Sequence, residues 1–444
     1  MPKAGERYTL KILKQRFADL PPALFPDEAR AEAARCLYCF DAPCTRACPT
    51  QIDIPSFIRQ ILHQNNLGAA RTIFDANIFG GSCARACPTE VLCEGACVDN
   101  TLLKSPVLIG RLQRFATDYA GQTRFYEPGP PTGKRVAIIG SGPAGLTCAH
   151  ELRKRGHDVV VFESRSIPGG LNTLGIAAYK ISTEFALTEI ERIKQIGIDI
   201  RLNSPIRGPA LHALLGDYDA VFLAIGLGKT LPLGIENESM PGVKEALDFI
   251  FPMHTGPYTD CEIGKRVIVI GGGNTAIDVA TAAVRLGADE VTIAYRRGEA
   301  AMPAFTYEHQ LAQTDGIRFE WFAQPVRVVV AAGRAAGVEF VRTRPDHPHS
   351  RESKLQQVAG SNFVLPCDMV IKALGQEPLL ELMTALPNLK IARDQVIIDP
   401  ATGATSVSKL FAGGDCIRGG GEIVDAVEDG KIAARGIHQS FVHA

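Results

Sequence analysis

The sequence predicts an α + α/β chain of several domains, in which a small α-helical domain precedes two doubly wound α/β domains, one inserted into the other. Three observations predict it: eight of the twelve cysteines lie in the first 100 residues, two glycine-rich turns each follow an apolar strand, and short apolar strands ending in glycine recur after those turns. We expect the helical domain at 1–125, one α/β domain at 130–229 and 376–444, and the inserted α/β domain at 230–375.

Composition is that of an ordinary soluble globular chain. With 444 residues, 46% hydrophobic and 21% charged, the chain is long enough for two or three domains, each with its own core. The net charge of -1 argues against a nucleic-acid binder. No apolar run approaches the roughly 20 residues that cross a bilayer, and the N-terminus has no apolar segment typical of a signal peptide. We therefore expect a cytoplasmic protein without disulfides and without membrane contact.

The cysteine pattern indicates iron–sulfur ligation. The spacing is Cys36-x2-Cys39-x4-Cys44-x3-Cys48-Pro, then Cys83-x3-Cys87-Pro, then Cys93-x3-Cys97. Cysteine runs that close on Cys-Pro, with a second set downstream, are how proteins hold [4Fe–4S] clusters. Tetrahedral zinc is the alternative, but the set contains no histidine. The segments between the cysteines have helical apolar spacing. The four later cysteines are expected to be ordinary buried or loop residues.

The first glycine-rich turn has the context of a dinucleotide site. Strand 135–139 leads into the turn, a helix follows, and a second strand, 158–162, ends in an acid that can bind ribose hydroxyls. Such glycines let backbone N–H groups approach a pyrophosphate. The residues predicted for this Rossmann-like site are Gly140, Gly142, Pro143, Ala144, Gly145 and Glu163.

The C-terminal segment favours FAD as the occupant of this first site. The segment 410–415 is an apolar strand that delivers Asp415 beside Gly414, before a glycine-rich turn and a helix at 423–439, which suits ribityl and phosphate contacts. Gly170 and Leu171 lie in a further segment expected at the flavin. That segment holds no cysteine pair of the kind that flavin disulfide reductases use, so electrons need another exit, and the N-terminal cysteines offer one.

The second glycine-rich turn predicts a nicotinamide nucleotide site. Its residues are Gly271, Gly273, Asn274, Thr275 and Ala276. At the end of the following strand, where an acid would bind the 2′-hydroxyl of NAD, stand Arg296 and Arg297. Guanidinium groups suit a 2′-phosphate, so this arginine pair favours NADPH over NADH. The alternative is a pair of solvated arginines without a ligand. No catalytic side chain is predicted. Lys180 is a candidate cation beside the flavin, or else a solvated lysine.

Several segments together carry a resemblance to a known family. They are 36–49, 87–93, 109–115, 140–145 and 411–415. In these segments the chain resembles the electron-input half of dihydropyrimidine dehydrogenase, and more closely the separate bacterial subunit with that role, within the wider group of the glutamate synthase small subunit. The resemblance covers nearly the whole chain.

The resemblance implies the cluster ligands. One [4Fe–4S] cluster is implied on Cys36, Cys39, Cys44 and Cys97, and the second on Cys48, Cys87, Cys93 and the side-chain oxygen of Gln113. Spacing alone points to Cys83 as the eighth ligand instead, and the two assignments remain alternatives.

The resemblance also implies the function. NAD(P)H would reduce FAD, and the two clusters would pass electrons to a partner FMN-containing subunit that reduces uracil or thymine, in a hetero-oligomer. We expect the chain itself to carry no pyrimidine site. The alternatives are the small subunit of a glutamate synthase or a related reductase, and a flavoprotein whose cysteines form a zinc-held docking module.

Overall fold

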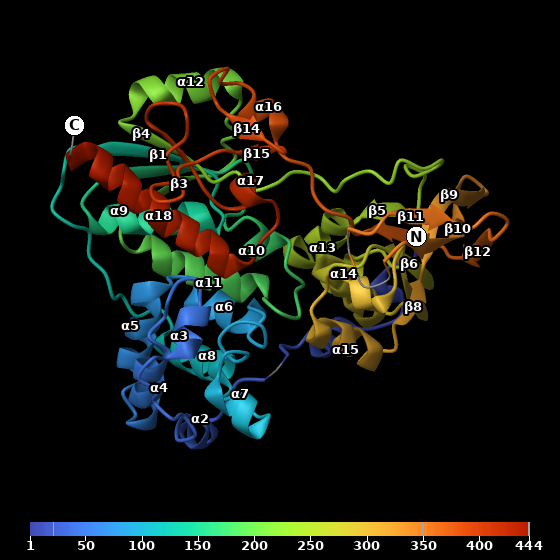
Figure 1. The fold of residues 1–444 in the computed structure, drawn as a ribbon, viewed down its shortest axis with the longest axis horizontal. Coiled ribbons are helices and arrows are strands. Elements are labelled where there is room, and N and C mark those ends of the chain that lie inside the picture. The colour runs from blue at the N-terminus through green and yellow to red at the C-terminus, as the bar shows by residue number, and fades with distance from the viewer. Residues whose placement is uncertain (21, 348–349, 351, 443–444) are drawn as a thin grey trace. The chain divides into compact units, whose positions relative to one another are not determined.

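The computed structural model describes residues 1–20, 22–347, 350 and 352–442, in two compact units (Figure 1). Unit 1 consists of Met1–Asp19, Leu174–Lys180 and Lys229–Glu377. Unit 2 consists of Leu20–Thr173, Ile181–Gly228 and Pro378–Ala444.

The N-terminal part of unit 2 is a helical bundle. Its helices are α2 (Pro26–Ala33), α3 (Pro43–Ala47), α4 (Ile54–Leu62), α5 (Asn66–Ala76), α6 (Gly80–Ala86), α7 (Val98–Leu103) and α8 (Ile109–Ala120). Side chains fix where two of them begin: Asp53 accepts a hydrogen bond from Ser56 N, and Asn65 accepts one from Gly68 N. The apolar faces then pack on one another, with Phe57 and Ile73 fully buried.

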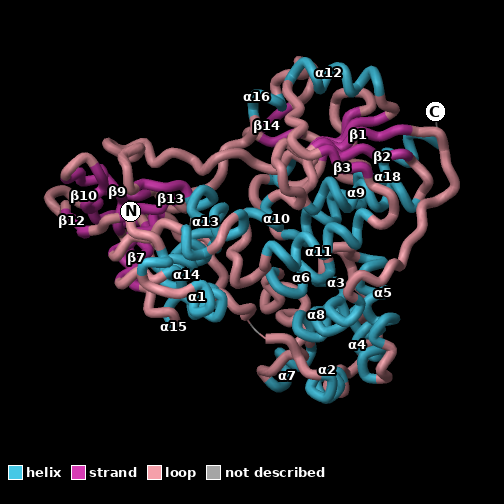
Figure 2. The backbone as a smooth tube through the Cα atoms, turned by 180° about the vertical axis from the view of Figure 1, so that it is seen from behind, coloured by secondary structure: helices cyan, strands magenta, loops and turns pink. Residues whose placement is uncertain are grey.

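The rest of unit 2 is a parallel sheet covered by helices, as Figure 2 shows. The strand order is β16-β4-β1-β2-β3. The strands are β1 (Arg135–Ile139), β2 (Asp158–Phe162), β3 (Asp199–Arg201), β4 (Ala220–Leu223) and β16 (Leu410–Ala412). The helices are α9 (Pro143–Lys154), α10 (Leu171–Leu174, which ends in unit 1), α11 (Thr183–Lys194), α12 (Gly208–Asp217), α16 (Leu380–Met383), α17 (Asp415–Arg418) and α18 (Ile423–Val442). A small hairpin joins β14 (Ile391–Ala392) to β15 (Gln395–Val396).

Helices α9 and α18 lie side by side in Figure 1 because glycine permits close approach. A Cβ on Gly430 would lie 2.4 Å from the carbonyl oxygen of Ala144. This contact places the C-terminal helix against the helix that opens at the first glycine-rich turn.

Unit 1 holds two sheets. The first is parallel, in the order β5-β13-β6-β7-β8, and in the second β10 pairs antiparallel with β9, β11 and β12. The parallel strands are β5 (Val243–Glu245), β6 (Arg266–Ile270), β7 (Glu290–Tyr295), β8 (Arg318–Trp321) and β13 (Met369–Lys372). The antiparallel strands are β9 (Ala323–Ala331), β10 (Arg334–Pro345), β11 (Leu355–Gln357) and β12 (Phe363–Pro366). The helices are η1 (Ala4–Glu6), α1 (Leu10–Arg16), α13 (Ala246–Thr255), η2 (Tyr258–Asp260), α14 (Asn274–Leu286), η3 (Glu299–Ala301) and α15 (Thr306–Thr314).

The first nineteen residues pack within unit 1, although the sequence suggested that they continue into the helical domain. Arg16 donates through Nε and Nη2 to the carbonyl oxygens of Arg285 and Val284 at the end of α14, both at 2.7 Å. A guanidinium there satisfies carbonyls that have no partner within the helix. In the described part of the chain, no helix has both the length and the apolar character that crossing a membrane requires.

Candidate functional site

Four of the predicted cysteines line one recess, which we call recess A. Cys36, Cys39, Cys44 and Cys97, together with apolar side chains of α4 and α8, line a recess of about 390 Å³ that is open to solvent. The loop between α2 and α3 reaches this arrangement through the left-handed conformation of Ala42 (φ 37°). Burial raises the pKa of the Cys44 thiol to about 11. The four side chains predicted to share one iron–sulfur group are thus brought together.

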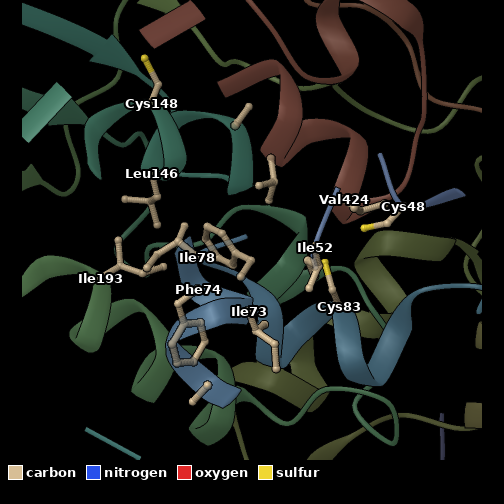
Figure 3. Packing of buried hydrophobic residues seen from close by; sticks show 14 of the residues in the cluster. Cys48, Ile52, Ile73, Phe74, Ile78, Cys83, Leu146, Cys148, Ile193 and Val424 are labelled. Atoms are coloured by element: carbon tan, nitrogen blue, oxygen red, sulfur yellow. The ribbon is translucent and has the colours of Figure 1, made fainter. Parts of the chain in front are cut away.

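The remaining cysteines of the first hundred residues line a second recess, recess B, of about 380 Å³. The polar residues in its wall include Cys48, Cys83, Cys87, Cys93 and Gln113. Figure 3 shows two parts of this wall, Cys48 beside Val424 of α18 and Cys83 beside Ile52. A contact with the Cys83 thiol and burial raise the pKa of Cys87, and burial raises that of Cys93.

Both candidates for the eighth ligand therefore reach recess B. Gln113 donates from Nε2 to the carbonyl oxygen of Gly80 at 2.7 Å, which orients its amide and leaves Oε1 as the acceptor end. The Cys83 sulfur accepts a hydrogen bond from Asn77 Nδ2 at 3.2 Å. The linings supply eight thiols and the Gln113 amide, with Asp99 as their one acidic residue and no histidine, and this donor set fits iron–sulfur groups. Among the residues that the structure describes, no three Cys, His, Asp or Glu side chains converge on one point as ligands of a single metal ion.

The first glycine-rich turn fits a pyrophosphate. Gly140 has φ 104°, and a Cβ there would lie 2.3 Å from Ala224 O; a Cβ on Gly145 would lie 2.0 Å from Gly140 O. A Cβ on Gly142, in contrast, would meet nothing within 4 Å. The outer glycines are therefore required by packing, and the middle one faces open space at the N-terminus of α9, where an anion can bind.

Other predicted flavin residues converge on this turn. A Cβ on Gly170 would lie 3.1 Å from Gly142 Cα, and one on Gly414 would lie 3.2 Å from Ala144 Cβ. Glu163 is buried, and its Oε2 accepts hydrogen bonds from Ser141 N at 3.1 Å and Ser141 Oγ at 2.6 Å.

The remaining predicted flavin residues frame the same region. Pro143 begins α9, Leu171 begins α10, and Asp415 begins α17. Burial raises the pKa of Asp415 to about 6, although its Oδ1 accepts a hydrogen bond from Gly421 N at 3.1 Å. The acid is thus held at a short helix beside Gly414.

The second glycine-rich turn, in unit 1, repeats this division of roles. A Cβ on Gly271 (φ 146°) would lie 2.2 Å from Ala373 O, whereas one on Gly273 would meet nothing within 4 Å. Asn274 Oδ1 accepts a hydrogen bond from Phe305 N at 3.0 Å, Thr275 is exposed, and Ala276 is buried. Gly273 therefore faces open space at the N-terminus of α14 and fits a second pyrophosphate.

The two arginines after β7 differ in their surroundings. Arg296 has an exposed side chain, while its carbonyl oxygen accepts a hydrogen bond from Thr343 Oγ1 at 2.6 Å. Arg297 is half-buried and donates from Nη2 to Ser353 O at 3.2 Å. Arg296 is thus the guanidinium that a nucleotide phosphate can reach, and Arg297 is engaged with its own unit.

Lys180 is not a solvated lysine, so that alternative was wrong, while its place beside the flavin stays a prediction. Its Nζ lies 2.7 Å from Asp278 Oδ1 on α14 and is also paired with Glu308 on α15. Burial disfavours its charge, but the two carboxylates outweigh that effect and raise the pKa of Lys180. Tyr179 donates to Asp278 Oδ1 at 3.0 Å. Sequence reasoning missed this cluster. The signal in the sequence was Asp278, an acid one turn after Asn274 of the second glycine-rich turn, in a helix of mostly apolar residues.

The class of protein follows from this geometry and from matches to two protein families. Residues 13–125 match the family described as dihydropyrimidine dehydrogenase domain II, 4Fe-4S cluster, and residues 134–430 match the pyridine nucleotide-disulphide oxidoreductase family. The chain belongs to these families, and it is an NAD(P)H-dependent oxidoreductase that uses FAD and [4Fe–4S] clusters. The zinc alternative is wrong, because the matched N-terminal domain is an iron–sulfur domain.

Two relatives show more closely which oxidoreductases the chain resembles. The chain is 37% identical to the glutamate synthase [NADPH] small chain of Escherichia coli, covering 96% of this chain and 94% of that one. It is 36% identical to the NAD-dependent dihydropyrimidine dehydrogenase subunit PreT of Salmonella typhimurium, covering 97% and 99%. Both relatives are subunits of larger enzymes by name, and they confirm the resemblance drawn from the sequence.

Solved structures support the fold. FprA of Mycobacterium tuberculosis, in complex with NADPH, has a TM-score of 0.59 at 20% identity, over 71% of this chain and 86% of that one. This likeness confirms the fold class of paired α/β domains.

Proposed function

We propose that this chain is the electron-input subunit of a hetero-oligomeric, cytoplasmic enzyme whose partner is an FMN-containing, pyrimidine-reducing subunit of the PreA type. Bound FAD would convert hydride from NAD(P)H into single electrons for the clusters and the partner, supporting reduction of uracil or thymine. The observation that carries the proposal is the pair of recesses, each lined by at least four cysteines, in the unit that also holds the flavin-type turn. The protein supplies position and electrostatics to these groups.

We assign recess A to a cluster on Cys36, Cys39, Cys44 and Cys97, and recess B to one on Cys48, Cys87, Cys93 and Gln113. The hydrogen bond from Gln113 Nε2 to Gly80 supports this choice, because it leaves the amide oxygen free for a metal. Cys83 already has a donor in Asn77 and serves as a neighbour in this assignment.

We assign FAD to the unit 2 turn, bound by Gly142, Glu163, Gly170 and Asp415, and the nicotinamide nucleotide to the unit 1 turn. Exposed Arg296 favours NADPH, since a guanidinium can bind a 2′-phosphate through charge-assisted hydrogen bonds. The two relatives bear NADPH and NAD in their names, so they do not decide between the nucleotides.

Electrons would leave through recess A. Recess B shares its wall with Val424 of α18, in the helix that packs on α9 of the flavin-type fold. Recess A is bordered by Leu37, which is 57% exposed, and Phe40 beside Cys39 is fully exposed. Large apolar side chains in water are typical of a surface that a partner covers.

Anaerobic purification with quantification of iron, acid-labile sulfide, zinc and flavin tests the cofactor assignment. Two [4Fe–4S] clusters give about eight iron and eight sulfide per chain with one FAD. Cys44→Ala should lower iron and sulfide by about half, whereas Cys148→Ala, at a buried cysteine of α9, should change neither. Zinc without sulfide would contradict the proposal.

The partner is tested by mixing the purified chain with each candidate acceptor. We expect NAD(P)H-dependent reduction of uracil with an FMN-containing pyrimidine subunit, because segments 41–44 and 110–115 resemble the dihydropyrimidine dehydrogenase branch of the family. The second candidate is a glutamate synthase, favoured by the 37% identity to its small chain. Glutamate formation with the large amidotransferase subunit, and no uracil reduction, would favour that function instead.

A further inference from the structure

A buried carboxylate joins the flavin-type fold to the helix beside recess B. Glu189 on α11 is 2% exposed. Its Oε1 accepts hydrogen bonds from Gly81 N at 2.9 Å and Ser82 N at 3.3 Å, and its Oε2 accepts one from Ser82 Oγ. All three donors belong to the first turn of α6, so a negative charge lies at the end of the helix where N–H groups have no other partner.

The same turn is held from the side of recess B. Gln113, which lines the recess, donates from Nε2 to Gly80 O, the residue before Gly81. Cys83, which also lines the recess, follows Ser82 directly. Glu189 therefore holds in place the turn that contains Gly80, whose carbonyl oxygen orients the amide of Gln113. The same turn leads directly into Cys83.

A second hydrogen bond continues from this turn toward the flavin segment. Asn172 donates from Nδ2 to Ser82 Oγ at 3.1 Å. Asn172 is buried, and it follows Gly170 and Leu171, which we assigned to the flavin. Glu189, Ser82 and Asn172 thus form a continuous chain from α11 through α6 to the flavin-binding segment.

The charge of Glu189 is only partly compensated. Arg192 Nη2 lies 3.4 Å from Oε1 and donates more closely, at 3.0 Å, to Ile78 O, while its guanidinium stacks 3.6 Å above the Phe74 ring. Removing the carboxylate would leave Arg192 as a buried cation without an acidic partner. Loss of the negative charge of Glu189 makes the electrostatic potential around α6 more positive. In a medium of low dielectric constant, such a change acts over several ångströms.

We propose that Glu189 is a positioning residue for the electron-transfer step between the flavin and the cluster of recess B. It holds the first turn of α6 in place for Gln113 and Cys83, and its charge keeps the reduction potential of that cluster low. The inference rests on the proposed function, because it requires a cluster in recess B.

The test compares Glu189→Gln with Glu191→Gln in the full-length, cofactor-loaded protein. Glu191 is on the same helix, but its side chain is 60% exposed and pairs with Lys194, so the control removes an equal charge that water already screens. Midpoint potentials of both clusters come from an EPR-monitored redox titration, and Cys44→Ala identifies the signal of recess B. Stopped-flow absorbance measures flavin reduction by NADPH separately.

In Glu189→Gln, the potential of the recess B cluster should rise relative to the wild type and Glu191→Gln, while that of recess A and the rate of flavin reduction stay unchanged. Ser82→Ala, which keeps the charge but breaks the link to Asn172, should retain the low potential. Equal potentials in Glu189→Gln and Glu191→Gln would overturn the inference. A wild-type chain without iron and sulfide would refute the proposed function instead.

If Glu189→Gln does not retain the cluster of recess B, Glu189→Asp decides the question. Restored iron content with the shorter carboxylate would support a role for the charge. Equal loss in both variants would reduce Glu189 to a packing residue and overturn the inference.

Discussion

Substitution of single glycines in the first turn should separate cofactor binding from folding. Gly142 has φ -67° and an open environment, so an alanine there is compatible with the backbone and touches no protein atom within 4 Å. We expect the free energy of unfolding of the cofactor-free chain to change by no more than about 0.5 kcal/mol. The added methyl group would instead occupy the place of the pyrophosphate.

The loss of FAD affinity in Gly142→Ala can be estimated from the contacts at stake. A hydrogen bond to a charged group contributes about 1.5–3 kcal/mol, so losing one weakens binding about 10- to 150-fold. Gly145→Ala is the matched control: its Cβ would lie 2.0 Å from Gly140 O, a backbone atom, so we expect about 1–3 kcal/mol of destabilisation from overpacking.

The assays are FAD titration by flavin fluorescence and thermal unfolding of the cofactor-free chains. The reasoning would be refuted if Gly142→Ala bound FAD as tightly as the wild type, or if Gly145→Ala unfolded at the wild-type temperature. In unit 1, Gly273→Ala should lower nucleotide affinity and leave FAD content unchanged, because its Cβ also meets no protein atom within 4 Å.

Three further predictions concern charged and titratable side chains. Arg296→Ala should raise the KM for NADPH about tenfold, corresponding to about 1.4 kcal/mol for one exposed charge-assisted contact. The KM for NADH in steady-state assays should stay unchanged. Equal effects on both nucleotides would contradict the 2′-phosphate assignment. Lys180→Met should destabilise unit 1 by about 3–5 kcal/mol, because Asp278 and Glu308 would remain buried without their cation; denaturant unfolding checks this against Lys194→Met, whose exposed pair should cost at most about 1 kcal/mol. His150 is buried and burial lowers its pKa to about 3, so only the unfolded chain takes up its proton as the pH falls below about 6.5. The contribution of His150 to the free energy of unfolding should therefore decline by about 2 kcal/mol between pH 7 and 5. Unfolding measurements at the two pH values should show a correspondingly smaller loss of stability in His150→Phe than in the wild type. Identical losses would count against a neutral His150 in the fold.

Local patterns predicted the elements that carry the sites. The apolar runs before each glycine-rich turn became β1 and β6, and the C-terminal helix begins at Ile423 as expected but ends at Val442 rather than 439. The antiparallel sheet of β9 to β12 was not predicted, although β9 and β10 contain partly alternating apolar residues. Its pairing is set by a turn at positive φ, Ala332 and Gly333, which carries little sequence signal.

The contacts of Glu189 and Asn172 with Ser82 could not be predicted from local patterns. Glu189 and Ser82 are 107 positions apart, and Asn172 and Ser82 are 90 apart. A buried acid on an amphipathic helix is visible in the sequence, but its partner depends on which elements pack together. The same holds for Lys180, whose partners lie on helices that come about a hundred residues later.

The helical domain and the flavin-type fold share one hydrophobic core, and this bears on how the domain behaves alone. Buried side chains from Phe57, Ile73 and Leu112 form one cluster with Leu146 and Ile193, and Figure 3 shows Phe74 and Ile78 packed near Leu146 and Ile193. A fragment spanning 20–125 would expose these surfaces to water and would lose Val424 from recess B. We therefore expect it to fail to assemble both clusters when iron and sulfide are supplied anaerobically, whereas the full chain succeeds. A folded fragment with its full complement of iron would show that metal binding alone stabilises the bundle, and the shared core would then serve to fix the distance between flavin and cluster.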